Sequence, residues 1–319
     1  VDPDRRLCTC EPGVSFRALV EATLAHGLLP TVVPELEGIT VGGAVAGCSV
    51  ESMSFRHGGF HDSCLEYEVV TGTGEILVCS PEREPLAFHM LHGSYGTLGI
   101  LTRATFRLVP ARPFVRLEYR HLRTAEAFRG EALASTRDAE IDFLDGIVHG
   151  PNHFVLCVGR FVDDAPMRSD YRGEEIFYRA TAERTEDYLS TADYCFRYDT
   201  ECHWMTATVP PLQWRIVRRL VGRWFLGSTN LIRWSNALAP LLALKRRPDV
   251  VCDYFLPART WMDFFPWYDR TIAHYPLWVV PYSIPEPYPW IDPDYARGTG
   301  DTMFFDCAVY GRRNDDRDV

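Results

Sequence analysis

The fold class is decided by residues 40–52, which read TVGGAVAGCSVES. Small residues at positions 42, 43, 44, 46 and 47 allow another group to approach the main chain closely. Backbone N–H groups without side-chain cover can meet an anionic or planar ligand. The alternative is a tightly packed strand and turn in which glycine serves packing alone. The spacing matches neither the dinucleotide pattern G-x-G-x-x-G nor the P-loop, which excludes a Rossmann assignment.

Short elements flank this segment on both sides. A helix is predicted between Ser15, a capping residue, and Gly27, a helix-ending residue. Alternating apolar residues around a glycine turn predict a hairpin over 65–78. The same alternation predicts a half-buried strand over 103–108.

A proline-rich junction at 110–113 is the predicted domain boundary. Beyond it, the sequence predicts a helix over 125–135 and a pair of strands within 143–161. The resulting fold class is α+β, with domains at 1–112 and 113–319. The second domain is expected to carry an antiparallel sheet with helices covering one face.

Composition narrows the class of protein further. A chain of 319 residues exceeds what one hydrophobic core fills, which favours two domains. The net charge of −10 argues against a protein that binds nucleic acid over its whole surface. The 10 cysteines show no zinc-ligand spacing, so we expect no metal site and a reducing, cytoplasmic location.

Several motifs follow one another in a specific order around residues 40–52. They are Pro34-Glu35-Leu36, Thr40-Val41-Gly42-Gly43, His57-Gly58 with Asp62, Val70-Thr71-Gly72-Thr73-Gly74-Glu75 and Gly96-Thr97-Leu98-Gly99-Ile100-Leu101-Thr102. This order resembles the second half of the FAD-binding domain of the vanillyl-alcohol oxidase/p-cresol methylhydroxylase (PCMH) flavoprotein family. The resemblance implies a partial PCMH-type FAD-binding domain at 1–112, followed by an α+β substrate (cap) domain at 113–319.

Within that family the sequence most resembles the delta(24)-sterol reductases, through Val50-Glu51-Ser52, Gly96-Thr97-Leu98-Gly99 and the distal stretch 275–285. The resemblance implies an FAD-dependent oxidoreductase acting on CH–CH groups. Such an enzyme reduces a carbon–carbon double bond in a sterol-like or other lipid side chain, with NADPH as electron donor. Family members begin with a further subdomain that carries the pyrophosphate-binding loop. Residues 1–15 do not supply that loop, so an N-terminally truncated chain is expected.

Carried over residue by residue, the resemblance implies that residues 40–52 line the flavin and pyrophosphate, mostly through backbone donors. Asp62 would lie in the turn beyond the flavin, and Ile100 would meet the adenine side through its main chain. The expected cofactor-binding residues are Thr40, Val41, Gly42, Gly43, Ala44, Val45, Ala46, Gly47, Cys48, Ser49, Val50, Glu51, Ser52, Asp62 and Ile100.

Reduction of a double bond also needs a proton donor beside the second carbon. The catalytic candidates are Glu51, next to the flavin segment, His57, and Tyr282 from the distal stretch. Tyr198 and His203 are further candidates in the substrate domain. Each can equally be a satisfied structural residue.

Residues 202–248 contain no Asp or Glu, while Arg and Trp accumulate there. A solvated pair of basic helices is the default interpretation. Nucleic-acid contact through Arg and stacked Trp is the second, but the acidic chain carries no nucleic-acid motif, and no such partner is expected. The third is peripheral membrane contact through residues 204–247, which suits a lipid or sterol-like small molecule as partner.

Two other functions stay open. One is an FAD-dependent alcohol or sugar oxidase or dehydrogenase of the same family. The other is a non-catalytic, truncated remnant that binds a partner or lipid. For an enzyme, the pocket is expected between the two domains, lined by aromatic residues from 254–290.

Overall fold

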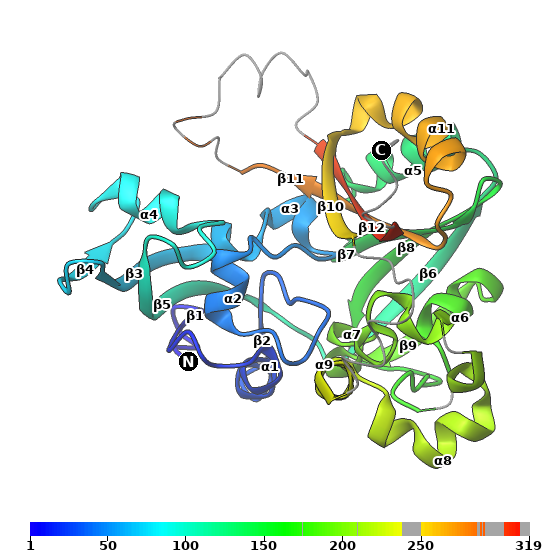
Figure 1. Ribbon diagram of the computed structural model, residues 1–319, viewed down its shortest axis with the longest axis horizontal. Coiled ribbons are helices and arrows are strands. Elements are labelled where there is room, and N and C mark those ends of the chain that lie inside the picture. Colours follow the sequence, from blue (N-terminus) through cyan, green and yellow to red (C-terminus); the bar gives the residue numbers. More distant parts are fainter. Residues whose placement is uncertain are drawn as a thin grey trace.

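The computed structural model describes residues 1–173, 175–208, 210–237, 250–285, 288, 290 and 303–312. Two antiparallel sheets with accompanying helices follow one another along the chain, on the left and on the right of Figure 1. The predicted α+β class is confirmed.

The first sheet has five strands in the order β1-β5-β3-β4, with β2 paired to β5. Its strands are β1 (Leu7–Cys10), β2 (Leu28–Pro30), β3 (Cys64–Thr71), β4 (Ile76–Cys79) and β5 (Gly99–Pro110). The predicted hairpin is confirmed as the antiparallel β3–β4 pair. The strand predicted over 103–108 is part of β5.

Four helices and one 3₁₀ turn accompany this sheet in the described part of the chain. They are α1 (Phe16–Leu24), α2 (Val41–Ala46), α3 (Ser54–His57), the 3₁₀ turn Phe60–Ser63 and α4 (Pro85–Leu91). The predicted helix is α1, whose first turn is capped by Ser15, since its Oγ accepts from the amide of Ala18 at 3.4 Å.

Residues 41–46 form the short helix α2, and not the strand of the packing interpretation. Thr40 caps the helix, because its Oγ1 accepts from the amide of Gly43 at 3.2 Å. Val41, Ala44 and Val45 are buried, which is the spacing of one helix face. The cap and the buried face outweigh the low helix propensity of two adjacent glycines.

The second sheet has seven strands in the order β10-β12-β11-β7-β8-β6-β9. Its strands are β6 (Phe114–Leu122), β7 (Phe143–Gly150), β8 (His153–Val162), β9 (Glu186–Ser190), β10 (Val250–Pro257), β11 (Leu277–Ser283) and β12 (Met303–Arg312). The predicted strand pair is confirmed as β7–β8. The chain changes sheets between Pro110 and Phe114. The division into domains 1–112 and 113–319 stays a prediction.

Helices α5 (Ala125–Ser135) and α11 (Trp261–Thr271) cover one face of the second sheet (Figure 1). Trp261 is fully buried, and its ring centroid lies 5.5 Å from that of Phe128 in α5 and 5.6 Å from that of Phe305 in β12. The helix predicted over 125–135 and the helix-covered face of the sheet are therefore confirmed.

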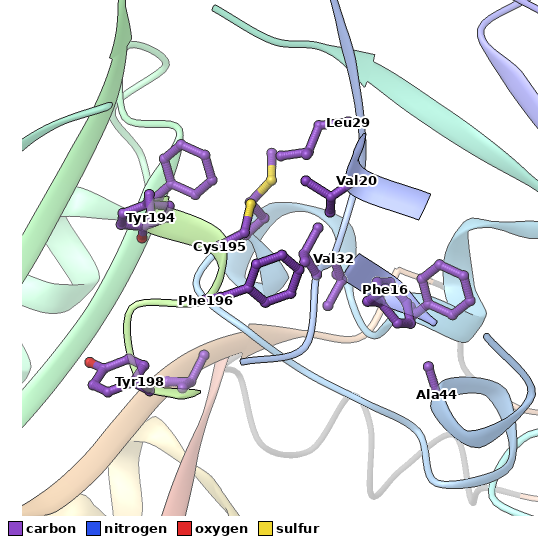
Figure 2. Packing of buried hydrophobic residues seen from close by; sticks show 14 of the residues in the cluster. Phe16, Val20, Leu29, Val32, Ala44, Tyr194, Cys195, Phe196 and Tyr198 are labelled. Carbon is purple, nitrogen blue, oxygen red and sulfur yellow. The ribbon is translucent and has the colours of Figure 1, made fainter. Parts of the chain in front are cut away.

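The opposite face of the second sheet shares one continuous core with the first sheet. Leu117 in β6 and Trp278 in β11 belong to the same cluster of buried residues as Phe16 in α1 and Phe106 in β5. Helix α7 (Thr191–Cys195) and the residues after it contribute to this shared core. Figure 2 shows Phe196 close to Val32, between the two parts of the chain. Packing therefore joins the two parts into one body.

The segment between β8 and β10 is mainly helical. Its elements are α6 (Phe177–Glu183), α7, the 3₁₀ turns Asp199–Thr208 and Pro210–Gln213, α8 (Arg215–Phe225) and α9 (Ser228–Ala237). Within the described residues, no helix combines the length and apolar character needed to cross a membrane.

Candidate cofactor and active site

The glycines of the cofactor segment divide into two kinds. Gly42 serves close packing, because a Cβ there would lie 2.7 Å from Cβ of Pro12, and its amide donates to the Pro12 carbonyl at 2.9 Å. Gly43 and Gly47 are exposed and present bare main chain to the surface. Gly42 thus serves packing, while the approach of a ligand to Gly43 and Gly47 stays a prediction.

Most amides of this segment already donate within the protein. The pairs are Val41 N to Val14 O at 2.9 Å, Ala44 N to Thr40 O at 2.9 Å, Gly47 N to Gly43 O at 2.8 Å, Cys48 N to Val45 O at 3.4 Å and Ser49 N to Ala44 O at 3.0 Å. In this conformation few amides of the segment are left to bind a ligand. A flat ring would instead lie against the uncovered peptide groups of the exposed glycines. The lining of FAD by residues 40–52 stays a prediction.

The loop before β5 packs along the end of α2. The amides of Gly93 and Tyr95 donate to the carbonyls of Val45 and Ala46 at 3.2 and 3.1 Å. The side chain of Tyr95 is 83% exposed and that of Ile100 is 71% exposed. The exposed ring of Tyr95 therefore stands beside the end of α2, where it can cover the face of a planar ligand. The contact of Ile100 with the adenine side stays a prediction.

Asp62 and Tyr282 are far apart in the sequence but lie together in the structure. Asp62 Oδ2 accepts from the amide of Gly59 at 2.7 Å, which closes the turn after α3. Burial raises the pKa of Tyr282, and the nearby Asp62 carboxylate and Cys48 thiol raise it further. The Tyr282 hydroxyl therefore stays protonated at neutral pH and remains a hydrogen donor. Cys48 belongs to the cofactor segment, so three predicted site residues converge here.

Gly58 allows this convergence. Its φ of 72° lies in the left-handed region that favours glycine. A Cβ at this position would overlap the Asp62 carboxylate and lie 2.7 Å from Cδ of Pro285, just after β11. Only glycine therefore lets the turn before Asp62 approach the end of β11, which is a tertiary reason for the His-Gly motif.

His57, the last residue of α3, is half-buried beside this turn. Burial lowers its pKa, and the neighbouring Arg56 lowers it further, so the imidazole is neutral at pH 7. Helix α3 contacts β11, since the Ser283 hydroxyl donates to the carbonyl of Ser54 at 3.4 Å. His57, Asp62 and Tyr282 therefore come from adjacent elements.

Glu51 lies in a different environment from Tyr282. It is 4% exposed, and its Oε1 accepts from Nη2 of Arg197 at 2.8 Å. Its Oε2 accepts from the amide of Ser52 at 2.6 Å and also from the Ser52 hydroxyl. Burial raises the pKa of Glu51, while Arg197 opposes that shift. Both oxygens are thus engaged within the protein.

Arg197 joins Glu51 to the second sheet. Its Nη2 also donates to Oδ2 of Asp145 in β7 at 3.2 Å, and the side chains of Arg197 and Asp145 are fully buried. The same Asp145 oxygen accepts from the Tyr198 hydroxyl at 2.7 Å and from the Trp278 indole at 2.9 Å. Tyr198, a candidate acid, is therefore a donor in this network; the side chain of His203 lies outside the described part.

Sequence reasoning missed Arg197 and Asp145. Neither stands in a motif, and the two residues are brought together only by the placement of α7 against the sheet. It also missed His92, whose ring nitrogens lie 3.0 Å from the Tyr67 hydroxyl and 3.1 Å from that of Tyr288. Burial lowers the pKa of His92 to about 3, so this ring is neutral.

A further buried carboxyl lies on the face of the second sheet that carries Asp145 and Tyr282. Asp306 in β12 stands between Phe255 of β10 and Val280 of β11 and is 1% exposed. Its Oδ1 has no hydrogen-bond partner among the described residues. Burial, with Asp253 and Glu35 nearby, raises its pKa well above the ordinary value. Burial also raises the pKa of Glu35 to about 8.

We expect Asp306→Asn to stabilise the protein at neutral pH. The Asp306 carboxyl is protonated in the folded protein but ionises near pH 4 in the unfolded chain. Its contribution to the free energy of unfolding is therefore fully present below about pH 4 and is lost as the pH rises. The amide stays neutral throughout, so stability should fall less steeply between pH 4 and 8 in urea unfolding. Asp163→Asn, at a 67% exposed side chain, is the control. If the free energy of unfolding of Asp306→Asn falls with pH as steeply as that of the wild type, Asp306 is not the buried, protonated carboxyl inferred here.

Comparisons with known proteins bear on the class. Residues 1–80 match the family described as FAD binding domain. The delta(24)-sterol reductase of Homo sapiens is 25% identical over 323 residues, which cover 98% of this chain and 62% of that protein. The delta(24)-sterol reductase homolog of Caenorhabditis elegans is 24% identical over 336 residues, which cover 98% of this chain and 63% of that protein. Cytokinin dehydrogenase 7 of Oryza sativa subsp. japonica is 36% identical over 135 residues, which cover 41% of this chain and 26% of that protein.

The fold is α+β, and residues 1–80 match an FAD-binding domain, so the chain is similar to FAD-linked oxidoreductases, as the motif order implied. Within that class it is similar to the delta(24)-sterol reductases along nearly its whole length. It spans less than two thirds of the length of those reductases.

Proposed function

We propose that this protein works in the FAD-dependent reduction of a carbon–carbon double bond in a sterol-like or other lipid side chain, with NADPH as electron donor. The observation that carries the proposal is the similarity to delta(24)-sterol reductases over 98% of the chain. Contacts of Glu51 and Ser52 with the second sheet also support it, because Arg197 donates to Glu51 at 2.8 Å and to Asp145 in β7 at 3.2 Å, and the amide of Leu144 in β7 donates to the carbonyl of Ser52 at 2.7 Å.

The residues present fit a flat cofactor beside α2. Gly43 and Gly47 have no side chain to obstruct a ring, and the exposed Tyr95 stands beside the end of α2. In its reduced form, bound FAD supplies the hydride that one carbon of the double bond receives. The chain's own residues would hold the ring, exclude water and supply a proton to the other carbon.

Tyr282 is the residue we propose for that proton. Its hydroxyl carries a proton at neutral pH and lies beside Asp62, although burial and the Asp62 carboxylate raise its pKa and make it a weaker acid than an exposed tyrosine. Its ring packs edge-on against Phe255, with centroids 5.3 Å apart. Glu51 is less suited, because Arg197 and Ser52 engage both of its oxygens. For His57, the lowered pKa leaves a neutral ring that would need the N–H tautomer aimed at the substrate.

The direct test gives purified protein FAD and then NADPH, with either a sterol carrying a side-chain double bond or a polyol. We expect the flavin absorbance bands to persist after gel filtration, and the olefin to be consumed only when NADPH is present. Oxidation of the polyol without NADPH would instead support the alcohol or sugar oxidase or dehydrogenase. A colourless protein that takes up no FAD would support the non-catalytic remnant.

A further inference from the structure

Helix α8 presents an apolar stripe to solvent. Ile216, Leu220 and Trp224 follow one another at four-residue spacing, so they lie along one side of the helix. Their exposed fractions are 74%, 70% and 58%, and Trp214, just before the helix, is 63% exposed. Exposed apolar side chains are ordinary when scattered singly, but a continuous stripe of this kind marks an interaction surface.

The opposite side of α8 holds the helix to the protein through a buried ion pair. Arg218 is 3% exposed and pairs with Glu201. Its Nε also donates to the carbonyl of Gly173 at 3.1 Å. A helix of a globular protein normally buries its apolar residues and exposes its charges. Here an arginine is inside and Ile216 and Leu220 are outside, so the stripe is not the core-facing side of the helix.

Positive charge runs beside the stripe. Arg215 and Arg219 each precede a stripe residue by one position and are exposed. The sequence has no Asp or Glu over 202–248, although the whole chain carries a net charge of −10. A basic and apolar surface on an acidic protein is complementary to an anionic, apolar partner.

We propose that α8 docks on anionic phospholipid bilayers. Ile216, Leu220 and Trp224 would enter the acyl boundary, while Arg215 and Arg219 would meet the lipid phosphates. In Figure 1, α8 lies at the lower edge of the molecule, where a flat surface can reach it. This narrows the membrane contact predicted over 204–247 to one helix; residues 238–247 lie outside the described part. The proposal does not rest on the proposed function, because vesicle binding requires neither FAD nor a substrate.

Other occupants explain less of the surface. Nucleic acid would engage the arginines but would leave Ile216 and Leu220 in water, since nucleic-acid sites use basic grooves with aromatic stacking. A second copy of this acidic chain could cover the stripe, but the exposed Arg215 and Arg219 would then meet the same charges on the partner helix in a symmetric contact. The bilayer satisfies both the apolar and the basic side of the helix.

The test is co-sedimentation of the full chain with phosphatidylcholine vesicles, with and without phosphatidylglycerol, at low and high salt. We expect binding to the anionic vesicles at low salt and weaker binding at high salt. Ile216→Ser with Leu220→Ser should lower the partition coefficient about tenfold or more. Arg219→Gln should lower it about fivefold, and only on anionic vesicles.

The matched control is Ile76→Ser, at a 70% exposed isoleucine on the first sheet. It should bind vesicles as the wild type does. Sedimentation velocity and urea unfolding check that the variants keep the wild-type mass and stability. The proposal is overturned if the wild type ignores phosphatidylglycerol vesicles at low salt, or if Ile76→Ser and the Ile216/Leu220 double variant bind equally. A stripe-dependent dimer without vesicle binding would also overturn it.

Discussion

Arg197→Met is expected to lower the free energy of unfolding by about 3–5 kcal/mol. The substitution keeps most of the side-chain volume and removes the only cation that the structure shows contacting both Glu51 and Asp145. Glu51 and Asp145 would then keep only neutral donors, those of Ser52, Tyr198 and Trp278, so burial of their negative charge would cost more free energy. Urea unfolding at pH 7 measures the loss.

The loss in free energy of unfolding should depend on the pH and on how deeply the substituted arginine is buried. Burial raises the pKa of Glu51, so at low pH Glu51 is protonated and needs no cation, and the difference in the free energy of unfolding between wild type and Arg197→Met should narrow. Arg103→Met is the control: its side chain is 45% exposed and pairs with Glu68 at 3.1 Å, so a loss below about 1 kcal/mol is expected. Adding Glu51→Gln and Asp145→Asn to Arg197→Met should recover part of the loss. Equal losses in the two arginine variants would contradict a buried link from Glu51 to the second sheet.

Tyr282→Phe is expected to lower the rate of olefin reduction by about 10²–10⁴-fold if the Tyr282 hydroxyl is the proton donor. The substitution keeps the ring against Phe255 and removes only the oxygen, so the sheet face keeps its shape. FAD titration should give unchanged affinity, because hydride supply and ring binding do not depend on this hydroxyl. The measurement is single-turnover decay of the reduced flavin in the presence of the olefin.

A second tyrosine serves as the control for that experiment. Tyr275→Phe removes a hydroxyl that donates to Asp269 at 2.7 Å, away from the face that carries Tyr282. Its rate of olefin reduction should match the wild type. If Tyr282→Phe also keeps the wild-type rate and FAD affinity, the proton comes from another group, and His57 is then the next residue to substitute.

Local patterns were sufficient for much of the secondary structure. Ser15 predicted the start of α1, and the glycine turn predicted the hairpin β3–β4, because caps and tight turns depend on a few consecutive residues. The same holds for α5 and for the β7–β8 pair. At residues 41–46 the strand alternative was wrong, since the cap at Thr40 decides for a helix despite the glycines.

The candidate site could be predicted only in part. Glu51, Asp62 and Tyr282 were singled out from motifs, but their surroundings were not. The pairing of Glu51 with Arg197 joins residues 146 positions apart, and no local spacing encodes such a contact. The outward orientation of α8 was equally hidden, because an amphipathic sequence does not say which side will meet the protein.

The sequence by itself determined the α+β class, the positions of α1, α5 and several strands, and the likeness to FAD-linked oxidoreductases, since these rest on hydrophobic period, turn chemistry and motif order. Only the tertiary structure decided that the two sheets share one core and that Arg197 links Glu51, between α2 and α3, to Asp145 in the second sheet. It also decided that Tyr282 meets Asp62. The physical reason is that strand order and register bring distant residues together, and those choices minimise the free energy of the whole chain, which no single segment specifies.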